Sequence, residues 1–140
     1  MGQRALSLVT LVVPDYDLAI AYFTAKLGFI LVCDEIMSTT KRWVVVRPGS
    51  SMEGCGLLLA KAANPEQSAA IGQQTGGRVA FFLNTDDFAA DHARLSKNGV
   101  KFCEKPRYEP YGIVAKFHDL FGNTWDLLQS SKSSTKLESF

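Results

Sequence analysis

Apolar and polar positions alternate along short segments that are separated by glycine, proline and aspartate, and this pattern is typical of strands joined by turns and helices. After the first such segment, Pro14 ends the strand and Asp15 and Asp17 offer N-cap carboxylates to a helix that ends at Gly28. The first sixty residues therefore predict the order strand, helix, strand, strand, strand. The expected strands are residues 6–13, 29–35, 42–47 and 55–60.

The second half of the chain repeats this order. The segment VTLVVPDYDLAIAYF (residues 9–23) aligns with VAFFLNTDDFAADHA (residues 79–93), 70 residues later. Each segment predicts a strand that leads into a helix with an aspartate at its start. The second helix, residues 87–98, is expected to end at Gly99, and strands are expected at residues 100–103, 113–117 and 124–128.

These elements predict one domain of 140 residues built from two βαβββ modules. A linker with a short helix capped by Asn64 is expected to join the modules, and the last eleven residues, rich in Ser and Lys, are expected to form a flexible tail. The expected boundaries are 5–62 for the first module, 63–77 for the linker, 78–129 for the second module and 130–140 for the tail.

Composition and charge exclude several function classes. The chain has 15 basic and 14 acidic residues, and this balance argues against a nucleic-acid-binding protein. No apolar run reaches the length of about 18 residues that a membrane-spanning helix needs. The 3 cysteines form no CxxC motif, so the sequence predicts neither a disulfide framework nor a zinc ribbon, and we expect a cytoplasmic protein.

Two motifs and the repeated module order resemble the vicinal-oxygen-chelate superfamily, which includes glyoxalase I, bleomycin-resistance proteins, fosfomycin-resistance enzymes and extradiol dioxygenases. The motifs are DYDLAIAYFTAKLGF (residues 15–29) and DLFGNTWDLLQ (residues 119–129). The resemblance implies an α+β fold in which each module is a curled mixed sheet with a helix. It also implies that the two sheets form a concave ligand cleft, often completed by a dimer partner.

The resemblance further implies metal-ligand positions on the first and last strands of each module. In this chain they fall on Leu8, on Gly56 or Leu57, on Arg78 and on Asp126. Leucine has no donor atom and arginine keeps its proton, so a site with three protein ligands cannot be assembled there. We therefore expect no cofactor. A divalent metal stays the alternative if the true register differs by one residue, since such a shift turns every side chain to the other face.

Arg78 and Asp126 suggest what replaces the metal. If the repeat is symmetric, the two side chains face each other and form a partly buried ion pair on the cleft floor. The alternative is that Arg78, which follows Gly76 and Gly77, points to solvent at the start of a strand.

Several further side chains are candidates for ligand contact. Strand alternation predicts an apolar wall with a few polar groups, although the same set would also suit an ordinary core. Trp43 and Trp125 could stack on a planar ligand or serve as core anchors. The segment 106–112, which includes Tyr111, could form a lid or a dimer contact or be a plain turn. The predicted wall is Leu8, Phe82 and Leu128, and its polar groups are Thr10, Arg78, Asn84 and Asp126.

The sequence therefore predicts a small-molecule-binding protein of the glyoxalase/bleomycin-resistance type with a degenerate metal site, which sequesters a planar or hydrophobic compound as a homodimer. The alternative is a lyase, isomerase or dioxygenase of the same superfamily, in which Asp126 is the base or a metal ligand and Arg78 holds an anion. A third interpretation is that the cleft is vestigial and a dimer surface provides the function.

Overall fold

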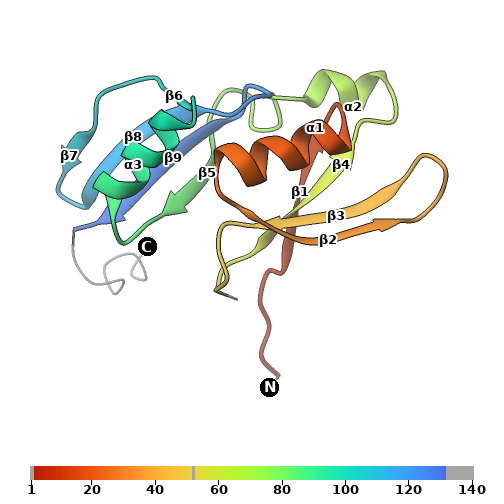
Figure 1. Cartoon of the computed structure of the whole chain (residues 1–140), viewed down its shortest axis with the longest axis horizontal. Helices are drawn as coiled ribbons and strands as arrows, with labels where there is room; N and C mark the ends of the chain where they lie inside the picture. Colours follow the sequence, from red (N-terminus) through yellow and green to blue (C-terminus); the bar gives the residue numbers. More distant parts are fainter. Residues whose placement is uncertain (1, 52, 132–140) are drawn as a thin grey trace. The chain divides into compact units, whose positions relative to one another are not determined.

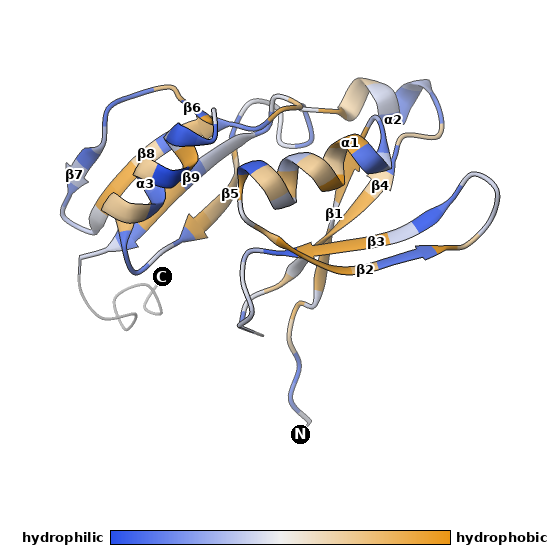
Figure 2. Ribbon diagram, viewed as in Figure 1, coloured by the Kyte–Doolittle hydropathy of each residue, from blue (hydrophilic) through white to orange (hydrophobic). Residues whose placement is uncertain are grey.

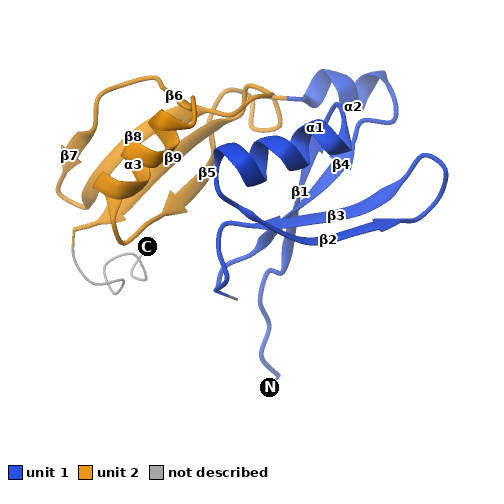
Figure 3. Cartoon of the chain, in the orientation of Figure 1, with its two compact units in different colours: residues 1–71 blue, residues 72–140 orange. Residues whose placement is uncertain are grey.

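The computed structural model describes residues 2–51 and 53–131, and the chain divides into two compact units, Met1–Ile71 and Gly72–Phe140 (Figure 3). The boundary between the units falls inside the segment 63–77 that was expected to be a linker. The short helix predicted there is confirmed, with the Asn64 side chain accepting a hydrogen bond from the backbone N–H of Gln67 at 2.9 Å. Of the expected tail, Ser130 belongs to the last strand, and residues 132–140 lie outside the described part of the chain.

The first unit has the predicted element order, and its sheet has the strand order β1-β4-β3-β2 (Figure 1). β1 and β4 are parallel, whereas β4, β3 and β2 pair antiparallel to their neighbours. The elements are β1 (Leu8–Val13), α1 (Tyr16–Ala21), the π-helical turn η1 (Tyr22–Lys26), β2 (Ile30–Ile36), β3 (Arg42–Arg47), β4 (Gly56–Lys61) and α2 (Pro65–Ala70).

α1 covers one face of this sheet. The ion pairs of Arg42 identify this face. Asp15 caps α1 by accepting a hydrogen bond from the N–H of Leu18 at 2.8 Å. From β3, Arg42 pairs with Asp17 in α1 at 2.9 Å and with Asp34 in β2 at 2.7 Å, and its guanidinium lowers the pKa of the Asp34 carboxyl. The Arg42 side of β3 therefore faces α1, and the side chains that alternate with it point to the opposite face.

The second unit has a five-stranded sheet with the order β5-β9-β8-β6, in which β7 also pairs with β8. β5 and β9 are parallel, as β1 and β4 are in the first unit. The expected order is confirmed, with one addition: part of the segment 106–112 is a strand, β7, that forms a hairpin with β8. The elements are β5 (Val79–Asn84), α3 (Phe88–Lys97), β6 (Lys101–Phe102), β7 (Arg107–Glu109), β8 (Gly112–His118) and β9 (Thr124–Ser130).

The strands of both units, including the edge strands β1 and β5, carry many of the hydrophobic residues (Figure 2). In the second unit, Trp125 is only 2% exposed, and its ring stacks on Phe117 with the centroids 5.7 Å apart and lies 4.6 Å from Phe81. Trp125 is therefore a core residue, which is the second of the two roles that the sequence left open for it. None of the helices in residues 2–51 and 53–131 combines the length and apolarity needed to cross a bilayer.

A buried carboxylate explains the motif DLFGN at the turn between β8 and β9. Asp119 accepts hydrogen bonds from the N–H groups of Phe121 at 2.9 Å and Asn123 at 3.0 Å, from the Asn123 side-chain amide at 2.9 Å and from the Trp125 indole at 3.0 Å. The turn also needs Gly122, whose φ of 97° is rarely adopted by other residues. The motif thus folds the turn and anchors the core tryptophan.

We expect Asp119→Ala to lower the free energy of unfolding by about 3 kcal/mol, because it leaves buried donors of Asn123 and Trp125 without an acceptor. Urea unfolding followed by tryptophan fluorescence measures this loss. Leu120→Ala is the matched control, since Leu120 is exposed in the same turn and should change stability little. Equal stabilities of the two variants would contradict the structural role of Asp119.

Candidate functional site

In the first unit, the sheet face opposite α1 forms one candidate surface, which we call the Trp43 face. The β3 side chains on it alternate with Arg42, and the strand register aligns Val45 with Leu58 of β4 and Leu58 with Thr10 of β1. Trp43 is 37% exposed on this face and offers flat apolar area. The Trp43 face is formed by Thr10, Trp43, Val45, Arg47 and Leu58.

The β2 edge of the Trp43 face is acidic. Cys33 lies opposite Val45 and Glu35 lies opposite Trp43. Burial and then the neighbouring carboxylates of Glu35 and Asp34 raise the pKa of the Cys33 thiol. Because a thiolate is the reactive form, this environment makes Cys33 a poor nucleophile.

Arg47 ends β3 on the Trp43 face and is only 9% exposed. Its Nη2 donates to the backbone carbonyl of Gly54 at 3.0 Å and lies 3.5 Å from that of Glu53, whereas its buried Nε has no hydrogen-bond partner. Gly56 leaves room for this side chain, because a Cβ at that position would lie 3.3 Å from Arg47 Cγ and 3.3 Å from Leu8 Cδ2. Arg47 is not among the site residues predicted from the sequence, although the alternation of Trp43, Val45 and Arg47 along one strand could have indicated it.

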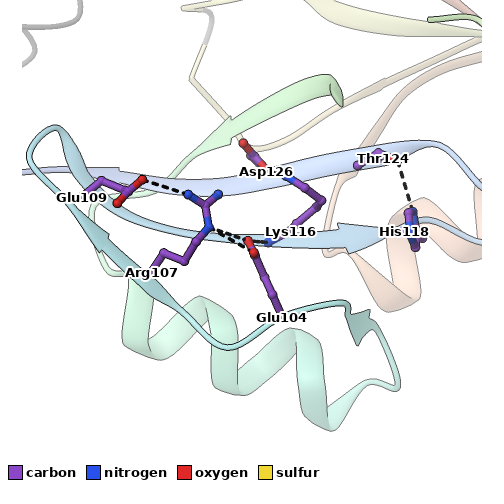
Figure 4. Close-up of polar contacts among 7 residues, drawn as sticks. All are labelled: Glu104, Arg107, Glu109, Lys116, His118, Thr124 and Asp126. Atoms are coloured by element: carbon purple, nitrogen blue, oxygen red, sulfur yellow. Dashed lines mark hydrogen bonds and ion pairs between the residues drawn. The ribbon is translucent and has the colours of Figure 1, made fainter. Parts of the chain in front are cut away.

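In the second unit, the sheet face opposite α3 forms the other candidate surface, which we call the Asp126 face. Asp126 is buried, and its Oδ1 pairs with Lys116 Nζ at 3.1 Å (Figure 4). Phe82 lies opposite Asp126 and is 63% exposed. The Asp126 face is formed by Phe82, Asn84, Lys116, Asp126 and Leu128.

The expected ion pair between Arg78 and Asp126 does not form, and the structure shows the alternative for Arg78, exposure at the start of a strand. A register shift between Val79 and Phe81 places Phe82 opposite Asp126. Arg78 precedes Phe82 by four residues, or about 13 Å along an extended chain. It is exposed in the turn before β5, where the Thr75 hydroxyl donates to its carbonyl at 2.7 Å.

A second charged cluster lies beside the Asp126 face. Glu104 accepts hydrogen bonds from Arg107 Nε at 3.0 Å and from the backbone N–H of Lys116 at 3.0 Å, and Arg107 also pairs with Glu109 at 3.1 Å (Figure 4). The hydrogen bonds to Glu104 are the main reason why the pKa of Arg107 is raised. These contacts hold β7 against β8, so this part of the segment 106–112 is one strand of a hairpin and not a plain turn.

The residues of the predicted wall are divided between the two units. Leu128 is buried and Asn84 is exposed on the Asp126 face, whereas Leu8 and Thr10 belong to the first unit. Tyr111 lies at the β7–β8 turn and is 37% exposed. A nearby hollow of about 330 Å³ contains none of the predicted site residues and is lined by Tyr108, Glu109, Gly112, Ile113, Gln129, Ser130 and Ser131.

The residues at the expected metal positions do not fit a divalent metal ion. Leu8 lies opposite Gly56, and the residue of the first unit that corresponds to Asp126 is Ala60, because Ala60 pairs with Val12 as Asp126 pairs with Phe82. Neither Leu8 with Gly56 nor Val12 with Ala60 supplies a donor side chain in the first unit. Within the described part of the chain, no group of three His, Cys, Asp or Glu side chains is placed to hold a metal ion.

The family model of the Glyoxalase/Bleomycin resistance protein/Dioxygenase superfamily matches residues 5–127. The chain belongs to this superfamily. The match covers most of both units and every residue of the two candidate faces except Leu128, so the resemblance inferred from the two motifs is confirmed.

Relatives within the superfamily and among solved structures agree with this assignment. A protein of Shewanella frigidimarina is 52% identical over 91% of this chain and 94% of its own length. The crystal structure of UcmS2 superposes with a TM-score of 0.76 at 31% identity, over 91% of this chain and 98% of that one. TnmS3, an antibiotic binding protein from Streptomyces sp. CB03234, has a TM-score of 0.74 at 30% identity, over 94% and 99% of the two chains.

The ion pair of the Asp126 face should contribute to the stability of this superfamily member. We expect Lys116→Met to lower the free energy of unfolding by about 1–3 kcal/mol, because the buried Asp126 carboxylate loses its cation. Urea unfolding at neutral pH measures the change, and Lys101→Met, an exposed lysine of the same unit, is the control. If both variants lose the same small amount, the pair contributes nothing to folding.

Proposed function

We propose that the protein binds a small planar or hydrophobic compound and releases it unchanged. The observation that supports this proposal is the exposure of one large aromatic side chain on each sheet face opposite a helix, Trp43 in the first unit and Phe82 in the second. Aromatic rings provide large contact area at low cost in conformational entropy. Trp43 shares its face with Val45 and Leu58, and contiguous apolar area of this kind is typical of binding surfaces.

The relatives support the same class of function. TnmS3 is described as an antibiotic binding protein, and at 30% identity it covers 94% of this chain. We propose that this chain shares the binding role and uses no cofactor, because the expected metal positions have apolar side chains in the first unit and Arg78 and Asp126 in the second.

A catalytic role as lyase, isomerase or dioxygenase is less well supported. It would require Asp126 as a base or a metal ligand. Asp126 is buried, and its carboxylate is already paired with Lys116 at 3.1 Å. This environment favours a structural role for Asp126.

We expect Trp43→Ala to weaken binding of the neutral planar probe biphenyl-4-carboxamide about three- to tenfold, because the probe loses an aromatic contact. Isothermal titration calorimetry measures the affinity, and mass spectrometry of the recovered probe should show an unchanged compound. Tyr108→Ala is the matched control, since Tyr108 is an exposed aromatic residue outside both faces. A chemically altered probe would favour the catalytic alternative, and equal losses in both variants would exclude Trp43 as the contact.

We further propose that the protein is a cytoplasmic homodimer. The three cysteines are unpaired, as expected in a reducing compartment. β2 is an edge strand with exposed apolar side chains, a feature that favours pairing with another chain. These side chains are Ile30, Leu31, Val32 and Ile36, followed by Met37.

Light scattering coupled to size-exclusion chromatography should give the mass of a dimer, and Ile36→Lys should shift the protein toward the monomer, because the substitution places a charge in the apolar edge. Leu120→Lys is the control, because Leu120 is exposed and apolar but lies outside β2. A monomeric wild-type protein would contradict the proposal.

A further inference from the structure

Arg47 differs from Arg42 and Arg107, the other arginines in the strands, because no acidic side chain of the described residues pairs with it. Arg42 is paired with Asp17 and Asp34, and Arg107 with Glu104 and Glu109. In residues 2–51 and 53–131, Arg47 takes part in no ion pair, and only its Nη2 has hydrogen-bond partners, both of them backbone carbonyls.

An arginine that is only 9% exposed and lacks an anionic partner is energetically unfavourable. The protein nevertheless makes room for this side chain, since Gly56 leaves the space beside Arg47 Cγ that any larger residue would crowd. The carbonyls of Glu53 and Gly54 accept hydrogen bonds from Nη2, and Nε is enclosed by the protein without an acceptor. Nη1 has no hydrogen-bond partner in the described part of the chain and is not among the enclosed atoms, so it is the nitrogen that can donate to a ligand. Arginine in this state is suited to bind an anionic oxygen through charge-assisted hydrogen bonds.

We infer that Arg47 binds the anionic group of the compound that the Trp43 face accommodates, so that the ligand is an elongated aromatic carboxylate or a similar oxyanion. This inference rests on the proposed binding function and specifies its ligand class. Arg47 and Trp43 lie four residues apart on the same face of β3, a separation of about 13 Å. Val45 and Leu58 lie between them and provide an apolar floor.

The geometry of the strand therefore orients the ligand. Its aromatic body lies along β3 toward Trp43, and its negative charge lies at the end of the strand beside Leu8 and Gly56. The opposite orientation would bring the anion close to Glu35, which lies across from Trp43, and like charges would repel. The Asp126 face has no equivalent group, because Lys116 is paired with Asp126 and Arg107 with two glutamates.

The test compares biphenyl-4-carboxylate with its neutral analogue biphenyl-4-carboxamide by calorimetry at fixed pH and ionic strength. We expect the wild-type protein to bind the carboxylate at least about tenfold more tightly than the amide, the size of effect that a charge-assisted hydrogen bond gives. Arg47→Met should remove this preference by weakening the carboxylate alone, and the affinity for the amide should stay within about twofold. Arg47→Lys keeps the charge and should retain part of the preference.

Arg78→Met is the matched control, since Arg78 is exposed in a turn and should leave the preference unchanged. Equal wild-type affinities for the two probes would overturn the inference and leave the proposed binding function intact. Failure of both probes to bind would count against the proposed function itself. A fall in the melting temperature of Arg47→Met with an unchanged preference would show that Arg47 only holds the Glu53–Gly54 segment.

Discussion

In each unit the first strand pairs in parallel with the last strand, and this pairing decides which side chains share a sheet face. In the first unit it sets Leu8 opposite Gly56, which leaves room for the long side chain of Arg47. In the second unit it sets Phe82 opposite Asp126, which places an exposed ring beside a buried carboxylate. A shift of one residue in either pair would exchange the core face and the outer face of a strand.

The two faces opposite the helices have different electrostatic properties, although the units share a topology. On the Asp126 face and beside it, each charge is compensated: Lys116 pairs with Asp126, and Arg107 pairs with Glu104 and Glu109. On the Trp43 face, Arg47 is buried without a carboxylate partner in the described part of the chain. The first unit therefore offers a charge to a ligand, whereas the second unit uses its charges to hold its own strands together.

Membership of the Glyoxalase/Bleomycin resistance protein/Dioxygenase superfamily is consistent with this distribution of roles. The motif that identifies the second unit serves folding, because the Asp119 carboxylate binds the turn and the Trp125 indole. The positions where metal-dependent members are expected to place donors hold apolar residues in the first unit. The fold is thus kept, with a helix on one face of each sheet, whereas the chemistry of the side chains on the opposite face differs.

The sequence by itself determined the element order, the helix ends at Gly28 and Gly99, and the membership of the superfamily. The element order and the helix ends depend on interactions within a few residues. These are a capping carboxylate, a glycine with positive φ and the alternation of side chains along a strand. Only the tertiary structure decided that Trp125 is buried whereas Trp43 is exposed, that Asp126 pairs with Lys116, and that Arg47 has no acidic partner among the described residues. These outcomes depend on the register between strands that lie far apart in the chain, and a repeat of 70 residues in the sequence does not require equal registers in the two units.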